Sequence, residues 1–288
     1  MKSTRIMYKS IVVNVLLAIV KFIFGFITKS QSIISEGVDS AMDSVNNLIA
    51  LYAIKKSHDP ADEDHPLGHG KVEYVASLLL SIVIILVGIL LIKEIFTVSQ
   101  GGSIPKPSSL IVLVSTTLVK VTLALYLIKQ SKLINNQLIY SLGKENLVDV
   151  LKSAVAFFGI ILSLLSQVFD FEYLKYGDTI AGGIIALFII KSGIEILSDS
   201  ISNILGKSAD QDTIKKYKQM IFEVEGVKEV KWVDIVKQGP YYLVLATILV
   251  DETLTIKEAH DIANNVDNVL ISTDEVIYSS IHIEPVEE

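Results

Sequence analysis

Six long apolar segments occupy the first two thirds of the chain. Each is long enough to cross the hydrocarbon core of a bilayer as a helix, which takes roughly 20 residues. The pattern predicts transmembrane helices at roughly 10–28, 33–54, 73–95, 109–128, 143–166 and 178–199. The second and fifth of these segments are more polar than the others.

The pattern changes after Gly206. From there on, hydrophobic and polar residues are interspersed as in a soluble domain. Helical periodicity and β-rich runs predict the order helix, strand, strand, helix, strand over 210–224, 227–237, 241–250, 255–270 and 276–283. Gln238-Gly239-Pro240 marks a hairpin between the first two strands. We therefore expect a transmembrane domain, 1–206, followed by a small cytoplasmic α+β domain, 207–288. That domain is expected to be ferredoxin-like or metallochaperone-like, with an antiparallel or mixed sheet under two helices.

Basic residues alternate between the two sides of the predicted spans. The loops on one side hold only Lys29, Lys106 and Lys175, whereas the other side carries both chain ends and most of the lysines. By the positive-inside rule both termini are cytoplasmic, and the predicted location is the cytoplasmic membrane, with the lipid bilayer as surroundings. The net charge of −7 and the lack of a basic stripe argue against a nucleic-acid partner.

The second span carries acids that hydrocarbon does not tolerate without compensation. Asp39 and Asp43 are four residues apart, so a helix projects both carboxylates from one face, and Glu36 precedes them by three. A charge at the centre of a bilayer costs roughly 2.5 to 3.5 kcal/mol on insertion scales. A bound cation is the natural compensation. Lys21 and Lys120, in the first and fourth spans, are expected to snorkel or to pair with helix carboxylates.

The fifth span repeats this spacing with Glu145 and Asp149, so two spans can together form a cage of four carboxylates. The chain has no cysteine, and all five histidines lie outside the predicted spans, which leaves only oxygen donors for a membrane site. Such a site favours Mn²⁺ or Fe²⁺ and leaves Zn²⁺, Co²⁺, Mg²⁺ and Ca²⁺ open. Excess negative charge predicts that an empty site holds protons and exchanges them for metal.

Two further groups of metal-ligating residues lie outside the spans. Asp62, His65 and His69 fall in the loop after the second span, where a metal site and an ordinary solvated loop are both compatible with the spacing. In the soluble domain, the second helix carries His260 and the last strand carries His282 and Glu284. Isolated histidines of this kind are usually structural.

Together these motifs resemble the cation diffusion facilitator family of proton-coupled divalent-metal exporters. The resemblance rests on Asn14…Lys21…Gly25, on Ser35-Glu-Gly-Val-Asp39-Ser-Ala-Met-Asp43, on Asp62-Glu-Asp-His65-Pro-Leu-Gly-His69-Gly-Lys71, and on Glu145-Asn-Leu-Val-Asp149. It implies that Asp39, Asp43 and Asp149 are ligands of the transport site. Glu145 stands where zinc-transporting members usually have histidine and manganese-type members commonly have aspartate. Manganese-type members often have asparagine at the position of Asp39, so the metal stays open.

The resemblance also implies features outside the transport site. Asp62, His65 and His69 match a loop site of the zinc members, and Lys71 and Asp199 resemble a charge pair that joins two protomers. His260, His282 and Glu284 match part of a metal site in the cytoplasmic domain. Lys231 and Thr247 fall about where the family has its other histidines, so a weak or one-ion site is expected. The family implies a homodimer that works by alternating access, with the transported metal and protons and no other cofactor.

Two other function classes compete with transport. A membrane metalloenzyme is disfavoured because the sequence has no His-Glu-x-x-His motif, no clear Ser/His/Asp arrangement and no phosphate-binding glycine loop. A membrane-bound metal sensor or scaffold that does not transport remains the alternative. It would need only the soluble domain's site, which is the incomplete one.

Overall fold

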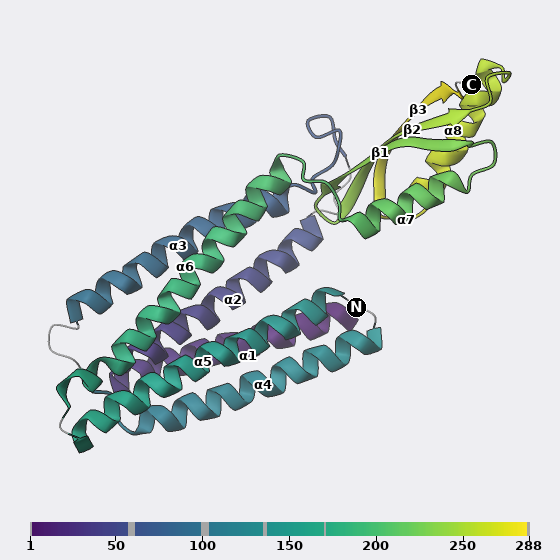
Figure 1. Ribbon diagram of the computed structural model, residues 1–288. Helices are drawn as coiled ribbons and strands as arrows, with labels where there is room; N and C mark the ends of the chain where they lie inside the picture. Colours follow the sequence, from purple (N-terminus) through teal and green to yellow (C-terminus); the bar gives the residue numbers. More distant parts are fainter. Residues whose placement is uncertain (1, 57–60, 99–103, 135–136, 170, 287–288) are drawn as a thin grey trace. The chain divides into compact units, whose positions relative to one another are not determined.

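The computed structural model describes residues 2–56, 61–98, 104–134, 137–169 and 171–286. Six long helices come first, followed by a small domain with two helices and three strands (Figure 1). Residues 1–51 and 79–197 form one compact unit, and residues 52–78 and 198–288 form a second. The long helices are α1 (Lys2–Thr28), α2 (Gln31–Lys56), α3 (Val72–Val98), α4 (Ser108–Ile134), α5 (Gln137–Phe169) and α6 (Gly177–Ile204), with a 3₁₀ turn, η1 (Glu172–Tyr176), before α6.

The chain is an α-helical membrane protein. In the described part of the chain, five helices are long and apolar enough to span a membrane, and α2 is the sixth long helix. The 26 residues of α2 match the others in length, but Glu36, Asp39 and Asp43 make it the most polar. The prediction of six membrane helices and a small α+β domain is confirmed.

Buried polar contacts hold α2 in place at its N-terminal end. The Asp178 carboxylate, at the start of α6, accepts hydrogen bonds from the Gln31 backbone N–H at 2.7 Å and the Ser30 hydroxyl at 2.8 Å. The bond from Gln31 satisfies a backbone donor that the first turn of a helix leaves unpaired, and the negative charge of Asp178 complements the helix dipole. Gly25 and Gly37 then allow α1 and α2 to approach closely. A Cβ at Gly25 would lie 2.8 Å from the Ile34 side chain.

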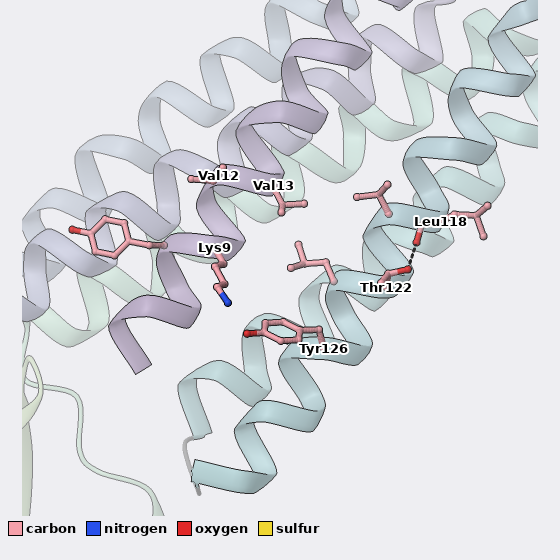
Figure 2. Close-up of a pocket in the computed structure, with 9 residues that line it drawn as sticks. Lys9, Val12, Val13, Leu118, Thr122 and Tyr126 are labelled. Atoms are coloured by element: carbon pink, nitrogen blue, oxygen red, sulfur yellow. Dashed lines mark hydrogen bonds between the residues drawn. The ribbon is translucent and has the colours of Figure 1, made fainter. Parts of the chain in front are cut away.

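A groove with almost entirely apolar walls lies between α1 and α4 (Figure 2). It encloses about 750 Å³ between Val12 and Val13 of α1 and Leu118 and Thr122 of α4. The Lys9 ammonium group lies 5.8 Å from the centre of the Tyr126 ring, a cation–π distance. No carboxylate lines this groove among the described residues, so its chemistry suits hydrocarbon rather than a metal ion.

The small domain is built from α7 (Gln211–Phe222), β1 (Glu229–Gln238), β2 (Tyr241–Val250), α8 (Ile256–Ile271) and β3 (Val276–Pro285). The sheet order is β1-β2-β3, with β1 antiparallel and β3 parallel to β2, so the sheet is mixed. Asp210 caps α7, and Thr255 and Glu258 form a capping box on α8. The apolar faces of both helices and of the sheet form one core, which contains Tyr217, Ile221, Ile235, Val244, Ile248, Val266 and Leu270.

We expect Ile248→Ala to lower the free energy of unfolding of this domain by about 2–5 kcal/mol, because it removes a fully buried side chain and leaves a cavity. Trp232, the one tryptophan of the chain, lies in β1, so urea unfolding can be followed by its fluorescence in the full-length protein. Ile256→Ala, at a side chain that is 91% exposed, is the matched control. Equal midpoints for the two variants would contradict the assignment of the core.

Candidate metal site

Three aspartates converge inside the bundle of long helices. Asp39 and Asp43 come from α2 and Asp149 from α5, and each places one carboxylate oxygen within 4.8 Å of the others. The i, i+4 spacing puts the α2 pair on one face of the helix, and that face meets α5. All three side chains are at least four-fifths removed from solvent. The arrangement is the type of oxygen cluster that holds a hard or borderline divalent cation.

Two lysines neutralise part of this cluster. The Lys120 ammonium group, from α4, donates to Asp43 at 3.1 Å and also to Asp149. The Lys152 ammonium group, from α5, donates to both oxygens of Asp39 at 2.9 Å and lies 2.9 Å from Asp149. The sequence indicated that Lys120 snorkels or pairs with a carboxylate, and the structure shows the pair. It did not indicate Lys152 as a partner, although Lys152 follows Asp149 by three residues on the same helical face.

The cluster opens onto a cavity of about 280 Å³ between α2, α5 and α6, with Ile84 of α3 at its wall. Glu145 lines this cavity, but its exposed side chain lies outside the group of three carboxylates. From α6 come Lys191 and Glu195, whose charged atoms are 3.6 Å apart. Sequence spacing gave no indication of these α6 residues, because they are assembled only by packing of the helices.

Glu36 does not join the aspartates but forms a separate buried ion pair. Its carboxylate lies 2.8 Å from the Lys21 ammonium group of α1, and both side chains are almost fully buried. Lys21 also donates to the Ser40 hydroxyl at 3.3 Å. Lys21 therefore neutralises an acid of α2, one of the two roles expected for it, and this pair ties α1 to α2.

The loop residues Asp62, His65 and His69 come together as a second potential metal group, with ligand atoms within 4.8 Å of one another. Asp62 lies 3.1 Å from Nδ1 of His65 and 3.3 Å from Nε2 of His69. Desolvation raises the pKa of the Asp62 carboxyl, but hydrogen bonds from the backbone and side chain of His65 and electrostatic attraction to His69 and His65 together outweigh it, so the pKa lies below its usual range. The buried Nδ1 of His69 has no hydrogen-bond partner in the described structure.

Contacts within the second unit position this loop beside the hairpin of the sheet. Gln238 donates its side-chain N–H to the Leu67 carbonyl at 3.3 Å, and the Gly239 N–H donates to the Tyr74 hydroxyl at 3.0 Å. Gly239, with a φ of +66°, makes the tight turn, and a Cβ there would lie 2.4 Å from the Gly70 carbonyl oxygen. The same turn thus connects the sheet to the loop.

Of the three potential ligands predicted in the small domain, His260, His282 and Glu284, only two lie close together. His282 and Glu284 are neighbours on β3, with Nε2 of His282 3.7 Å from the carboxylate. Glu284 is also paired with Lys231 of β1, and this hydrogen bond holds the pKa of its carboxyl below the usual range. His260 is exposed on α8 and joins no group of three potential ligands among the described residues. The weak or one-ion site predicted there stays a prediction.

Lys71 and Asp199, the pair expected to join two protomers, each have a partner within the chain. The Lys71 ammonium group donates to the Ile204 carbonyl at 3.1 Å, and Asp199 pairs with Lys207 at 2.9 Å. Both residues belong to the second unit. A bond between protomers would have to replace or extend these contacts.

Comparisons with known proteins match nearly the whole length of the chain. The family model for the cation efflux transmembrane domain matches residues 7–205, and the model for the cation efflux protein cytoplasmic domain matches residues 209–286. The manganese efflux system protein MneP of Bacillus subtilis (strain 168) is 31% identical over 288 residues, covering 98% of this chain and 96% of that protein.

A second relative and a solved structure are also similar. The manganese efflux system protein MneS of the same organism is 27% identical over 283 residues, covering 97% of this chain and 94% of that protein. Among solved structures, a variant of the MamM CTD in its cadmium form aligns with a TM-score of 0.26 and 19% identity, covering 27% of this chain and 98% of that one.

We expect Lys120→Met to destabilise the helical bundle by about 3–5 kcal/mol, because it leaves Asp43 and Asp149 without their buried ammonium partner. Lys132→Met, at an exposed lysine in the last turn of the same helix, is the matched control. The measurement is the thermal unfolding midpoint of the full chain in detergent. A Lys120→Met midpoint as high as that of the control would show that the buried pair does not stabilise the bundle.

Proposed function

Because the chain belongs to the cation diffusion facilitator family of cation efflux proteins, we propose that it exports a divalent transition-metal ion in exchange for protons. The metal binds at Asp39, Asp43 and Asp149, with Glu145 at the rim of the cavity. The observation that carries this proposal is the cluster of three buried carboxylates inside the helical bundle. A protein has little reason to gather acids in hydrocarbon unless a cation passes or binds there.

The donor set favours Mn²⁺ or Fe²⁺, and Zn²⁺ and Co²⁺ are the next candidates. Carboxylate oxygens suit harder cations, whereas zinc takes nitrogen or sulfur readily. All five histidines lie outside the six long helices, and the chain has no cysteine. Two relatives are named as manganese efflux proteins, which favours Mn²⁺ within this group.

Exchange for protons follows from the chemistry of the ligands. A carboxylate must be deprotonated to bind metal, so metal entry releases protons that the site holds, and proton entry expels the metal on the other side. In the proposed cycle the site faces the two sides of the membrane in turn, as a population shift between two conformations. Both termini face the cytoplasm, because basic residues concentrate on that side of the long helices, and the proposed location is the cytoplasmic membrane.

A homodimer is the proposed assembly. The match of residues 209–286 to the cytoplasmic domain of cation efflux proteins supports pairing through this domain, and we propose that Lys71 and Asp199 exchange their contacts within the chain for contacts with the second copy. Light scattering of the purified chain that gave the mass of a monomer would contradict this assembly.

A sensor or scaffold fits the geometry less well than a transporter. A sensor needs metal bound in the soluble domain, where the described residues bring together only His282 and Glu284 of the expected trio. The loop group of Asp62, His65 and His69 would suit a sensor, but a sensor has no use for the buried cluster among the membrane helices, which borders a cavity. We also propose that the chain is not an enzyme, since the cation efflux family to which it belongs consists of transporters.

In proteoliposomes loaded with a fluorescent metal indicator, we expect Asp43→Ala to abolish Mn²⁺ flux, because it removes one of three convergent ligands. Glu145→His is expected to keep flux and to shift preference from Mn²⁺ toward Zn²⁺, because it adds a nitrogen donor at the rim. Glu94→Ala, at an exposed acid of α3 outside the cavity, is the control and should transport like the wild type. Normal flux through Asp43→Ala would refute the assignment of the site.

Inside-out membrane vesicles test the exchange with protons. Addition of Mn²⁺ is expected to release protons from wild-type vesicles, followed with a pH-sensitive dye, and an imposed pH gradient is expected to drive Mn²⁺ uptake. Vesicles with Asp43→Ala provide the background. Metal uptake that released no protons and did not respond to the pH gradient would be compatible with metal efflux but would exclude exchange for protons.

A further inference from the structure

We propose that Lys152 competes with the transported metal for the carboxylates of Asp39 and Asp149, so that metal binds by displacing an ammonium group. This inference rests on the proposed function and deepens it by assigning a residue that sets metal affinity. It makes Lys152 a positioning and specificity-determining residue rather than a ligand.

The contacts of Lys152 carry the first step. Its ammonium group lies 2.9 Å from both oxygens of Asp39 and from one oxygen of Asp149. A lysine ammonium group donates hydrogen bonds and cannot coordinate a cation. A divalent ion that uses the same oxygens would be repelled by this positive charge at close range. Metal and ammonium therefore exclude each other at these two carboxylates.

The surroundings of the two lysines differ, because of the two only Lys152 borders a cavity into which its ammonium group can move. The Lys120 side chain is 1% exposed and is not among the residues that line the cavity. The Lys152 side chain is 12% exposed and lines the cavity together with Glu145, Ser192 and Glu195. A displaced ammonium group finds acceptors on that wall, while Lys120 stays between Asp43 and Asp149. Lys120 is thus a fixed charge and Lys152 a movable one.

Formal charge supports this division. In the deprotonated form that binds metal, the three aspartates with the fixed Lys120 carry a net charge of −2, which one divalent ion balances when Lys152 has left. With Lys152 in place the cluster carries −1, so most of its charge is already compensated. The site therefore favours a doubly charged ion over a singly charged one, because only the former replaces more charge than the lysine supplies.

Competition of this kind suits a transporter better than a storage site. A carrier must bind its ion tightly enough to load it and weakly enough to release it. A tethered ammonium group lowers the net affinity of the carboxylates for metal. Because it is part of the chain, it has a fixed effective concentration at the site and can take the place of the metal when the metal leaves. Without Lys152, we expect tighter binding and slower release.

Mn²⁺ binding to the purified full chain tests the competition. All proteins carry Asp62→Ala and Glu284→Ala, which remove a ligand of the loop group and a ligand of the site predicted at His282 and Glu284, so that the titration reports on the membrane cluster. We expect Lys152→Gln to tighten Mn²⁺ binding by tenfold or more. Lys191→Gln is the matched control, since it removes the same charge from the same cavity but its lysine pairs with Glu195. It should change affinity by less than about threefold, because exposed charges interact weakly.

Transport kinetics separate this role from a structural one. In proteoliposomes, Lys152→Gln is expected to lower KM for Mn²⁺ and also to lower kcat, whereas Lys152→Arg, which keeps a tethered cation, is expected to stay near the wild type. A Lys152→Gln protein that binds Mn²⁺ no more tightly than Lys191→Gln, or more weakly than wild type, would overturn the proposal. If instead Asp43→Asn leaves Mn²⁺ binding unchanged in this background, the metal site itself is wrong, and the proposed function fails with it.

A measurement on the wild-type chain keeps the test valid even if Lys152→Gln does not fold. Reductive methylation of lysines, read by mass spectrometry, is performed with and without saturating Mn²⁺. Displacement predicts that methylation of Lys152 rises at least threefold with Mn²⁺, while Lys191 in the same cavity stays constant and Lys120 stays protected. Methylation of Lys152 that is unchanged or reduced by Mn²⁺ would overturn the inference.

Discussion

Charge balance among buried groups is the constraint on which this structure depends. Three carboxylates lie close together among the membrane helices, and an unpaired charge in such surroundings costs several kcal/mol. Lys120 and Lys152 supply the compensation from two different helices, so α2, α4 and α5 are joined at one point. The same interactions that stabilise the bundle also define where a cation can bind.

The fold holds α2 in register with its neighbours by three separate means. Asp178 anchors the first turn of the helix, and the Lys21–Glu36 pair attaches it to α1. Gly25 and Gly37 let the two helices come close enough for that pair to form without solvent. Asp39 and Asp43 follow directly on this anchored stretch. Their position against Asp149 is therefore a consequence of contacts that lie nearer the start of the helix.

The amino-acid sequence predicted features that depend on local spacing and on the cost of burying charge. The i, i+4 interval placed Asp39 and Asp43 on one helical face, and their apolar surroundings marked them as functional. The helix and strand order of the small domain was also predictable, because periodicity and turn residues are local signals. The sequence did not distinguish an antiparallel from a mixed sheet, since the pairing of strands is decided by packing between distant segments.

Contacts between segments far apart in the sequence could not be predicted from local spacing. Glu145 shares the i, i+4 spacing of the other acids, yet it is exposed at the rim, because spacing fixes the helical face of a residue but not how deeply neighbouring helices bury each turn. The pairing of Lys152 with Asp39 joins residues 113 positions apart, and nothing in the spacing of either helix encodes it. His260 likewise matched a motif by position, while the structure keeps it apart from a three-ligand group with His282 and Glu284.

Anomalous diffraction at the manganese edge from crystals of the full chain grown with Mn²⁺ tests the central claim most directly. The account predicts a peak within coordinating distance of oxygens from Asp39, Asp43 and Asp149, with the Lys152 ammonium group moved away from Asp39. A map with strong manganese peaks only outside the long helices, and with Lys152 still bound to Asp39 and Asp149, would contradict it.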